Sequence, residues 1–224
     1  TRDWSSDVCS SDLDDDRELL PSYLRFVRGI IDSEDLPLNV SREILQQNRI
    51  LDNIRSASVK KLLSEFKKMG EAADKARKSE KPSDDEKAAI EKWNKFVKNF
   101  NRPMKEGLYS DYANRDEIAE IVRFKSTDAS GKDGNYTSFA DYVQRMKPDQ
   151  KSIFYISGSD EKNLRENPLL KAYVAKGFEV LVMDDDIDDI VITGYGKYKD
   201  FELKAVNRSG SDEDLGGDKE EAKK

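Results

Sequence analysis

Arg42 and Gln46 are the two residues of this chain best suited to act on a bound substrate. They lie four positions apart in Asp35–Gln47, where Pro37 stiffens a loop and Ser41 can cap the helix that follows. This spacing places the guanidinium and the amide on one face of a helix. A guanidinium is a planar, permanently charged donor for phosphate oxygens, and a nearby amide can orient a phosphate or a water. The pair could therefore serve a nucleotide held elsewhere, as an arginine finger does.

A simpler interpretation of Arg42 is a surface ion pair. Its side chain could fold back onto Glu43 or Asp35, and the residue types alone favour this arrangement. Against it, a cation at the first position of a helix opposes the helix dipole, which suggests that Arg42 serves something outside the helix. Periodicity by itself leaves both interpretations open.

The other motifs are weaker. The chain has no His and one Cys, which excludes a His- or Cys-based zinc site, an internal disulfide and a His-activated nucleophile. The acidic run Asp184–Asp189 has calcium-loop spacing, but Asp189 stands where the loop needs Gly and Tyr195 where it needs Glu. We therefore predict a solvated turn between a strand and a helix there. Gly131-Lys132 and Gly194–Gly196 lack the residues that complete a phosphate or dinucleotide loop.

Composition limits the class of partner. Of the 224 residues, 38% are charged and 36% hydrophobic, and the net charge is -7. An acidic chain whose cations alternate with acids predicts neither nucleic acid nor an anionic membrane as a partner. Because no apolar run approaches the length of a membrane span or a secretory signal, we predict a cytoplasmic protein.

Helical periodicity dominates the first two thirds of the chain. Residues 1–13 have no period and resemble translated sequencing-adaptor read-through, so they are left out of the fold prediction. After a short helical turn at residues 18–23, the β-forming residues of Leu24–Ile31 predict a strand. Apolar residues from Leu51 to Met69 then predict a helix that Gly70 weakens and could end.

Two capping boxes mark the helices that follow. Ser83 with Glu86 opens a helix that carries Trp93, Phe96 and Phe100 at core spacing and that Pro103 closes. Asn114 with Glu117 repeats the box before a shorter third helix.

The last third of the chain changes period. Ser138 caps a short helix, and strands are predicted at 152–157 and 178–183. The helix between them, Leu169–Lys176, starts near Pro168 and stops at Gly177. Strand, helix and strand form a right-handed unit on a parallel sheet. The fold class is therefore α/β (α+β).

Four segments resemble one known family. They are Leu20–Gln46, Asp141–Met146, Ile153–Gly158 and Gly177–Met183. In order and in sequence they resemble the middle domain of the Hsp90 chaperones of bacterial type, over about Asp14 to Asp189.

This resemblance implies a function for the parent protein. The family dimerises, handles unfolded client proteins and hydrolyses ATP with Mg in an N-terminal domain that this chain lacks. Arg42 and Gln46 match the family residues that reach the γ-phosphate of ATP, so the chain alone should bind no cofactor and be inactive. The alternative is a non-catalytic module that binds clients or co-chaperones.

The resemblance also implies a domain plan. A non-native or disordered extension (1–13) precedes the end of a large αβα layer with the catalytic loop (14–48). A three-helix coil (49–125), a small αβα layer (126–208) and a disordered charged tail (209–224) follow. Asp186 replaces a Pro of the family, and the β-branched run Ile190–Gly194 disfavours the helix that the family has after Met183.

Overall fold

The computed structural model describes residues 19–30, 49–128 and 136–208. They belong to two compact units, which meet in the sequence between Val59 and Lys60. The predictions for residues 1–13, for the Arg42 loop and for the tail lie outside the described residues.

The helices are η1 (Ser22–Leu24), α2 (Arg49–Arg77), α3 (Asp84–Ser110), α4 (Arg115–Ile121), α5 (Phe139–Arg145), α6 (Glu161–Glu166), α7 (Pro168–Ala175) and α8 (Asp188–Tyr195). The strands are β1 (Lys125–Ser126), β2 (Ser152–Ser157), β3 (Leu181–Met183), β4 (Lys197–Tyr198) and β5 (Phe201–Ala205).

The predicted strand Leu24–Ile31 is wrong over its described part. The short helix η1 ends at Leu24, and the chain continues to Ile30 without a ladder partner. Tyr23 and Leu24 are fully buried, whereas the side chain of Ile30 is 81% exposed. A strand satisfies its backbone groups only by pairing, and the described residues of this unit include no other strand. High β-propensity alone therefore does not produce one.

Helices α2 and α3 confirm the two long helical patterns but not their predicted ends. Gly70 lies inside α2, which continues to Arg77. Pro103 lies inside α3, which continues to Ser110. Proline removes one helical hydrogen bond, but the turn after it buries Met104 and Leu108 completely or nearly so, and this burial offsets the loss.

The predicted caps have mixed outcomes. Ser83 forms the full capping box, since its hydroxyl accepts from the Glu86 N–H and the Glu86 carboxylate accepts from the Ser83 N–H. Ser138 likewise caps α5. Asn114 precedes α4, but its side chain makes no cap hydrogen bond; its amide nitrogen donates to Asp111 at 2.8 Å.

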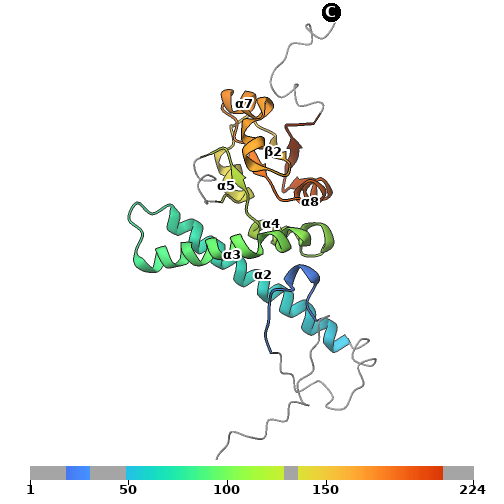
Figure 1. The fold of residues 1–224 in the computed structure, drawn as a ribbon. Coiled ribbons are helices and arrows are strands. Elements are labelled where there is room, and N and C mark those ends of the chain that lie inside the picture. Colours follow the sequence, from blue (N-terminus) through green and yellow to red (C-terminus); the bar gives the residue numbers. More distant parts are fainter. Residues whose placement is uncertain (1–18, 31–48, 129–135, 209–224) are drawn as a thin grey trace, which may run out of the picture. The chain divides into compact units, whose positions relative to one another are not determined.

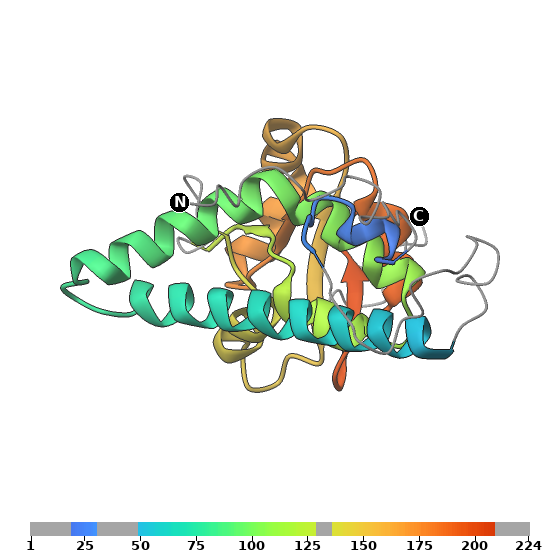
Figure 2. The same ribbon diagram turned by 90° about the horizontal axis from the view of Figure 1, so that it is seen from below.

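Aromatic rings fill the contact between the second-unit part of α2 and α3. Phe66 of α2 lies 4.8 Å from Phe96 of α3, and Trp93 stacks on Phe96 at 5.2 Å. Figure 2 shows both helices extending to the same side of the loop that joins them, so the chain runs along them in opposite directions. Trp93 is fully buried, so the predicted packing role of these rings is confirmed.

Gly70 is present in α2 because nothing larger fits. A Cβ atom at this position would lie 2.8 Å from Nη2 of Arg123 and 2.9 Å from Cζ2 of Trp93. The helix therefore tolerates a residue of poor helix propensity in exchange for close approach of these two side chains.

Replacing Gly70 with alanine should lower stability, although alanine is the better helix former. We expect a loss of about 1–3 kcal/mol from overpacking, against a gain of about 1 kcal/mol in propensity. Urea unfolding followed by circular dichroism measures the difference. Glu71→Ala, at the next and exposed position, is the matched control and should change stability little. A Gly70→Ala protein more stable than the parent would contradict this packing.

In the described residues, five strands form one mixed sheet in the order β1-β3-β2-β5-β4. Figure 1 labels its central strand, β2. The central strand β2 is parallel to β3 on one side and to β5 on the other. The predicted strand–helix–strand unit is thus confirmed, with β3 starting later than the predicted residue 178. Helix α6, inside the same crossover, was not predicted.

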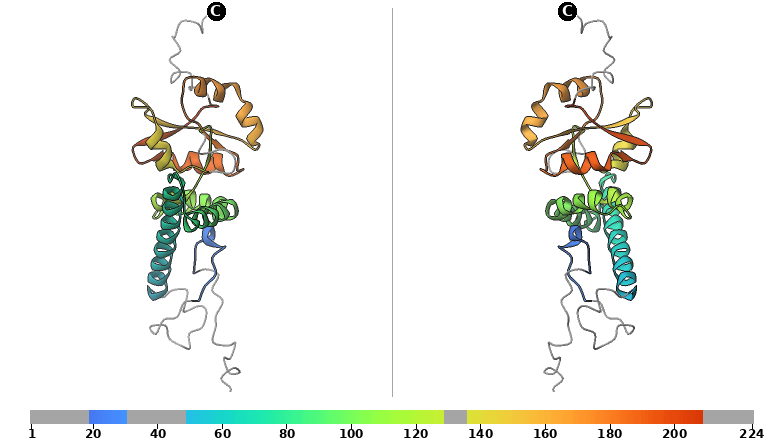
Figure 3. Two further views of the ribbon diagram at one scale, coloured as in Figure 1. Left: turned by 90° about the vertical axis from the view of Figure 1, so that its left-hand side faces the viewer. Right: turned by 90° about the vertical axis from the view of Figure 1, so that its right-hand side faces the viewer.

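Helices cover both faces of this sheet (Figure 3). Phe154 and Ile156 of β2 face α6 and α7, in a core that includes Leu164, Leu170 and Tyr173. On the other face, Phe139 of α5 lies 6.3 Å from Tyr195 of α8 and 5.1 Å from Tyr198.

The helix after Met183 is present, despite the β-branched run that disfavoured it. In α8, Val191 and Ile192 are buried and Tyr195 is nearly so. Tertiary burial of one face outweighs the small helix propensity cost of the branched residues.

Candidate functional site

Arg42 and Gln46, the predicted site residues, lie outside the described residues. Their candidacy therefore remains a prediction from the sequence.

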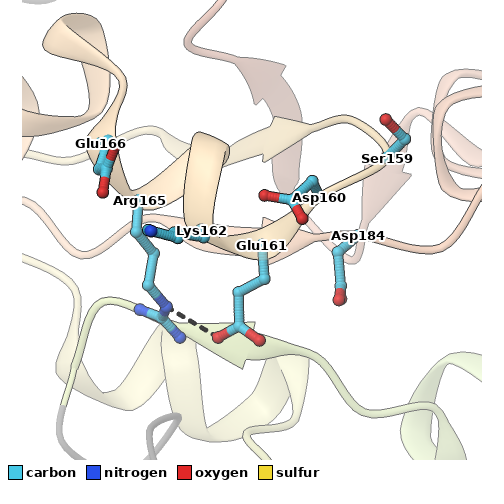
Figure 4. A pocket seen from close by; sticks show the side chains of 7 residues that line it. All are labelled: Ser159, Asp160, Glu161, Lys162, Arg165, Glu166 and Asp184. Carbon is cyan, nitrogen blue, oxygen red and sulfur yellow. Dashed lines mark hydrogen bonds and ion pairs between the residues drawn. The ribbon is translucent and has the colours of Figure 1, made fainter.

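An open pocket lies beyond the carboxyl ends of β2 and β3 (Figure 4). This edge is where ligands bind in many parallel sheets with covering helices. Apart from Ser159, its lining is charged: Asp160, Glu161, Lys162, Arg165, Glu166 and Asp184.

Ion pairs join several of these charges. Lys125 lies 2.7 Å from Glu161 and 2.6 Å from Asp184, and Arg165 donates to Glu161 at 2.8 Å. The hydrogen bond from Lys125, against a smaller opposing effect of burial, lowers the pKa of Glu161. These ion pairs join β1, α6 and the turn after β3. No cluster of acidic, His or Cys side chains fit for a metal ion occurs in the described ranges.

The acidic run Asp184–Asp189 forms the turn from β3 into α8, as predicted, but it is not simply solvated. Asp188 is fully buried and lies 2.7 Å from Nζ of Lys105. Asp186 accepts a two-pronged contact from Arg102 of α3. The run is therefore a structural connection to α3.

Two buried cations were missed in the sequence analysis. Lys105 is 3% and Arg123 2% exposed. The burial of Lys105 could have been predicted, because this residue lies three positions before buried Leu108 and directly after buried Met104. Arg123 lies between buried Val122 and Phe124, in a segment with no helical period to judge it by.

Tyr198 links the end of β4 to α4. Its hydroxyl donates to the carboxylate of Glu120 at 2.7 Å. Burial, together with the neighbouring Glu120 carboxylate, raises the pKa of Tyr198 to about 12.

This shift predicts a loss of stability in alkali. An unfolded tyrosine ionises near pH 10, whereas Tyr198 in the folded chain keeps its proton to about 12. Its contribution is thus fully present below about pH 10 and falls as the pH rises through the folded pKa. Urea midpoints measured across this range should decline, and less steeply for Tyr198→Phe. Identical pH dependence in the two proteins would contradict the assignment.

None of the described helices is long and apolar enough to cross a bilayer.

Comparison with known proteins places the fold. The model of the family described as Hsp90 protein matches residues 12–224. The chain is 63% identical over 207 residues to the chaperone protein HtpG of Treponema denticola, covering 92% of this chain and 30% of that protein. It is 56% identical over 202 residues to HtpG of Treponema pallidum, covering 90% of this chain and 29% of the relative.

A solved structure agrees. The middle domain of a Plasmodium falciparum heat shock protein superposes with a TM-score of 0.66 and 31% sequence identity, covering 86% of this chain and 67% of that one. The fold is therefore that of a chaperone middle domain. This chain belongs to the Hsp90 family, and it spans less than a third of the length of the two HtpG proteins.

Proposed function

We propose that this chain is the middle segment of an ATP-dependent Hsp90-type chaperone. The observation that carries the proposal is the identity of 63% with HtpG of Treponema denticola over nearly the whole chain. ATP, with Mg, would bind in an N-terminal domain of the same polypeptide, and the protein would act on unfolded client proteins as a cytoplasmic homodimer.

Arg42 and Gln46 are the residues we assign to ATP hydrolysis. A guanidinium and an amide are donors that fit phosphate oxygens. Residues 41–46 match the Ser-Arg-Glu-x-Leu-Gln motif of the family, with Ile44 at its variable position. Arg42 would stabilise the negative charge that develops on the γ-phosphate oxygens, and Gln46 would support that contact. Neither residue holds the metal.

The proposal is tested in a chimera. Residues 14–208 replace the corresponding segment of Treponema denticola HtpG, and ATP turnover and suppression of aggregation of an unfolded protein are measured. We expect both activities to stay within about tenfold of those of the unmodified chaperone, because the replaced segment keeps most of its side chains. A folded, dimeric chimera with neither activity would contradict the proposal.

A further inference from the structure

A group of five charged residues connects α3 to the turn between β3 and α8. We call Arg102, Lys105, Asp185, Asp186 and Asp188 the α3–α8 clamp. The two cations lie three positions apart on α3, and the three acids lie within four positions at the start of α8.

Lys105 is the centre of the clamp. Its Nζ lies 2.6 Å from Asp185 and 2.7 Å from Asp188, and 5.0 Å from the ring centroid of Phe124. The side chains of Lys105 and Asp188 are 4% and 0% exposed. Asp188 also accepts the backbone N–H of Asp185 at 3.2 Å, which closes the turn.

Arg102 forms the outer part of the clamp. Its guanidinium donates to both carboxylate oxygens of Asp186, at 2.9 and 3.1 Å. Both side chains are well exposed, so this pair contributes little to the free energy of folding. Its two-pronged geometry restricts the orientation of α3 relative to the turn.

The buried pair is a poor device for stability alone. Transfer of two charges out of water costs free energy that their attraction often fails to recover, and apolar residues of similar volume usually stabilise as well or better. Burial raises the pKa of Asp188 even though Lys105 opposes that shift, in keeping with a large desolvation cost. Some other property of the pair has to account for its place here.

An ion pair fixes the relative position of the two elements that it joins, whereas an apolar contact lets them slide against each other. A slide of α3 by one residue would move Lys105 by about 1.5 Å along the helix axis and leave Asp188 buried without its counter-charge. Apolar side chains would tolerate the same slide with a modest loss of contact.

We propose that the α3–α8 clamp fixes the orientation of α3 against the sheet layer, so that the two move as one body. The clamp acts as a conformational lock and adds little net stability.

The test compares stability with orientation in the 224-residue chain. Spin labels are placed at two exposed positions, with Glu91→Cys on α3 and Lys171→Cys on α7, after Cys9→Ser removes the native thiol. Double electron–electron resonance spectroscopy then gives the distribution of distances between the two spin labels. Urea unfolding of the same proteins gives stability.

We expect Lys105→Met alone to lower the urea midpoint, because it leaves Asp188 buried and unpaired. The double variant Lys105→Met/Asp188→Leu should regain most of the midpoint of the parent, short only of the lost turn hydrogen bond from the Asp185 N–H, while its distance distribution becomes about twofold wider. Arg102→Gln leaves no buried charge without its partner. It should widen the distance distribution to a smaller degree and leave the urea midpoint unchanged.

Lys125→Met/Asp184→Leu is the matched control. It removes an ion pair of 2.6 Å that joins β1 to the residue after β3 and not α3 to α8, and it should leave the distribution as narrow as in the parent. A narrow distribution in the Lys105→Met/Asp188→Leu protein, or a double variant that stays as unstable as Lys105→Met, would overturn the proposal. So would an unchanged distribution in Arg102→Gln.

Discussion

Replacing Arg42 with alanine in the chimeric chaperone should reduce ATP turnover by roughly 10²- to 10³-fold while ATP affinity stays the same. Our proposal gives this guanidinium a contact with charge that develops only as the γ-phosphate is transferred. An interaction made only in the transition state lowers kcat without weakening the binding of the ground state. Steady-state turnover and equilibrium binding of a fluorescent ATP analogue measure the two quantities separately.

Arg49→Ala is the matched control for this prediction. Arg49 is the first residue of α2, is exposed and lies seven positions after Arg42. Its removal changes net charge equally and should leave turnover within about twofold of the parent. Gln46→Ala should give an intermediate loss of about tenfold, because it removes support and no formal charge. Equal ATP turnover in the Arg42→Ala and Arg49→Ala proteins would contradict a role of Arg42 in ATP hydrolysis.

Replacing Arg123 with alanine should destabilise the second unit by about 3 kcal/mol or more. Nη1 of Arg123 donates to the carbonyl oxygens of Glu120, Ile121 and Val122 at 2.8 to 3.1 Å and so satisfies the end of α4. Nη2 donates to Asp74 of α2 at 2.7 Å. One buried guanidinium therefore joins α2 to α4.

The ring of Trp93 adds to this cost. The guanidinium carbon of Arg123 lies 5.0 Å from the ring centroid, within cation–π range. Arg123→Ala should unfold at a lower urea concentration than the parent. Arg123→Lys should recover only part of the lost stability, because an ammonium group cannot reproduce the forked hydrogen bonds of the guanidinium. Arg102→Ala, which removes an exposed guanidinium, should cost less than about 1 kcal/mol. A similar cost for Arg102→Ala and Arg123→Ala would contradict this account.

Elements set by local chemistry could be predicted from the sequence. The capping box at Ser83 depends on residues three positions apart, and it forms as expected. Strand β2 has the predicted bounds, since its run of β-formers ends at a glycine. The parallel pairing of β2 with β3 follows from the length and helical content of the crossover.

Features set by distant contacts could not. Gly70 is compatible with an uninterrupted α2 because Trp93 and Arg123 approach it from other parts of the chain. Pro103 is tolerated because the turn after it is buried. A local pattern contains neither contact, so it predicts the end of a helix at each position.

The candidate site shows the same division. The possible chemistry of Arg42 and Gln46 follows from their residue types and spacing, but the residue types alone favour a surface ion pair for Arg42. The chain belongs to the Hsp90 family. The catalytic role of the two residues is our proposal, made from their resemblance to that family. The buried charges of the α3–α8 clamp have no comparable motif, because Lys105 and Asp188 lie far apart in the sequence.

The most direct test of the central claim is photochemical labelling of the chimera with an ATP analogue whose reactive group is attached at the γ-phosphate. If residues of this chain reach the γ-phosphate, the label will appear on the proteolytic fragment that contains Arg42 and Gln46, and excess ATP will abolish it. Label confined to the N-terminal domain, in a chimera that hydrolyses ATP, would contradict the role that we assign to this chain.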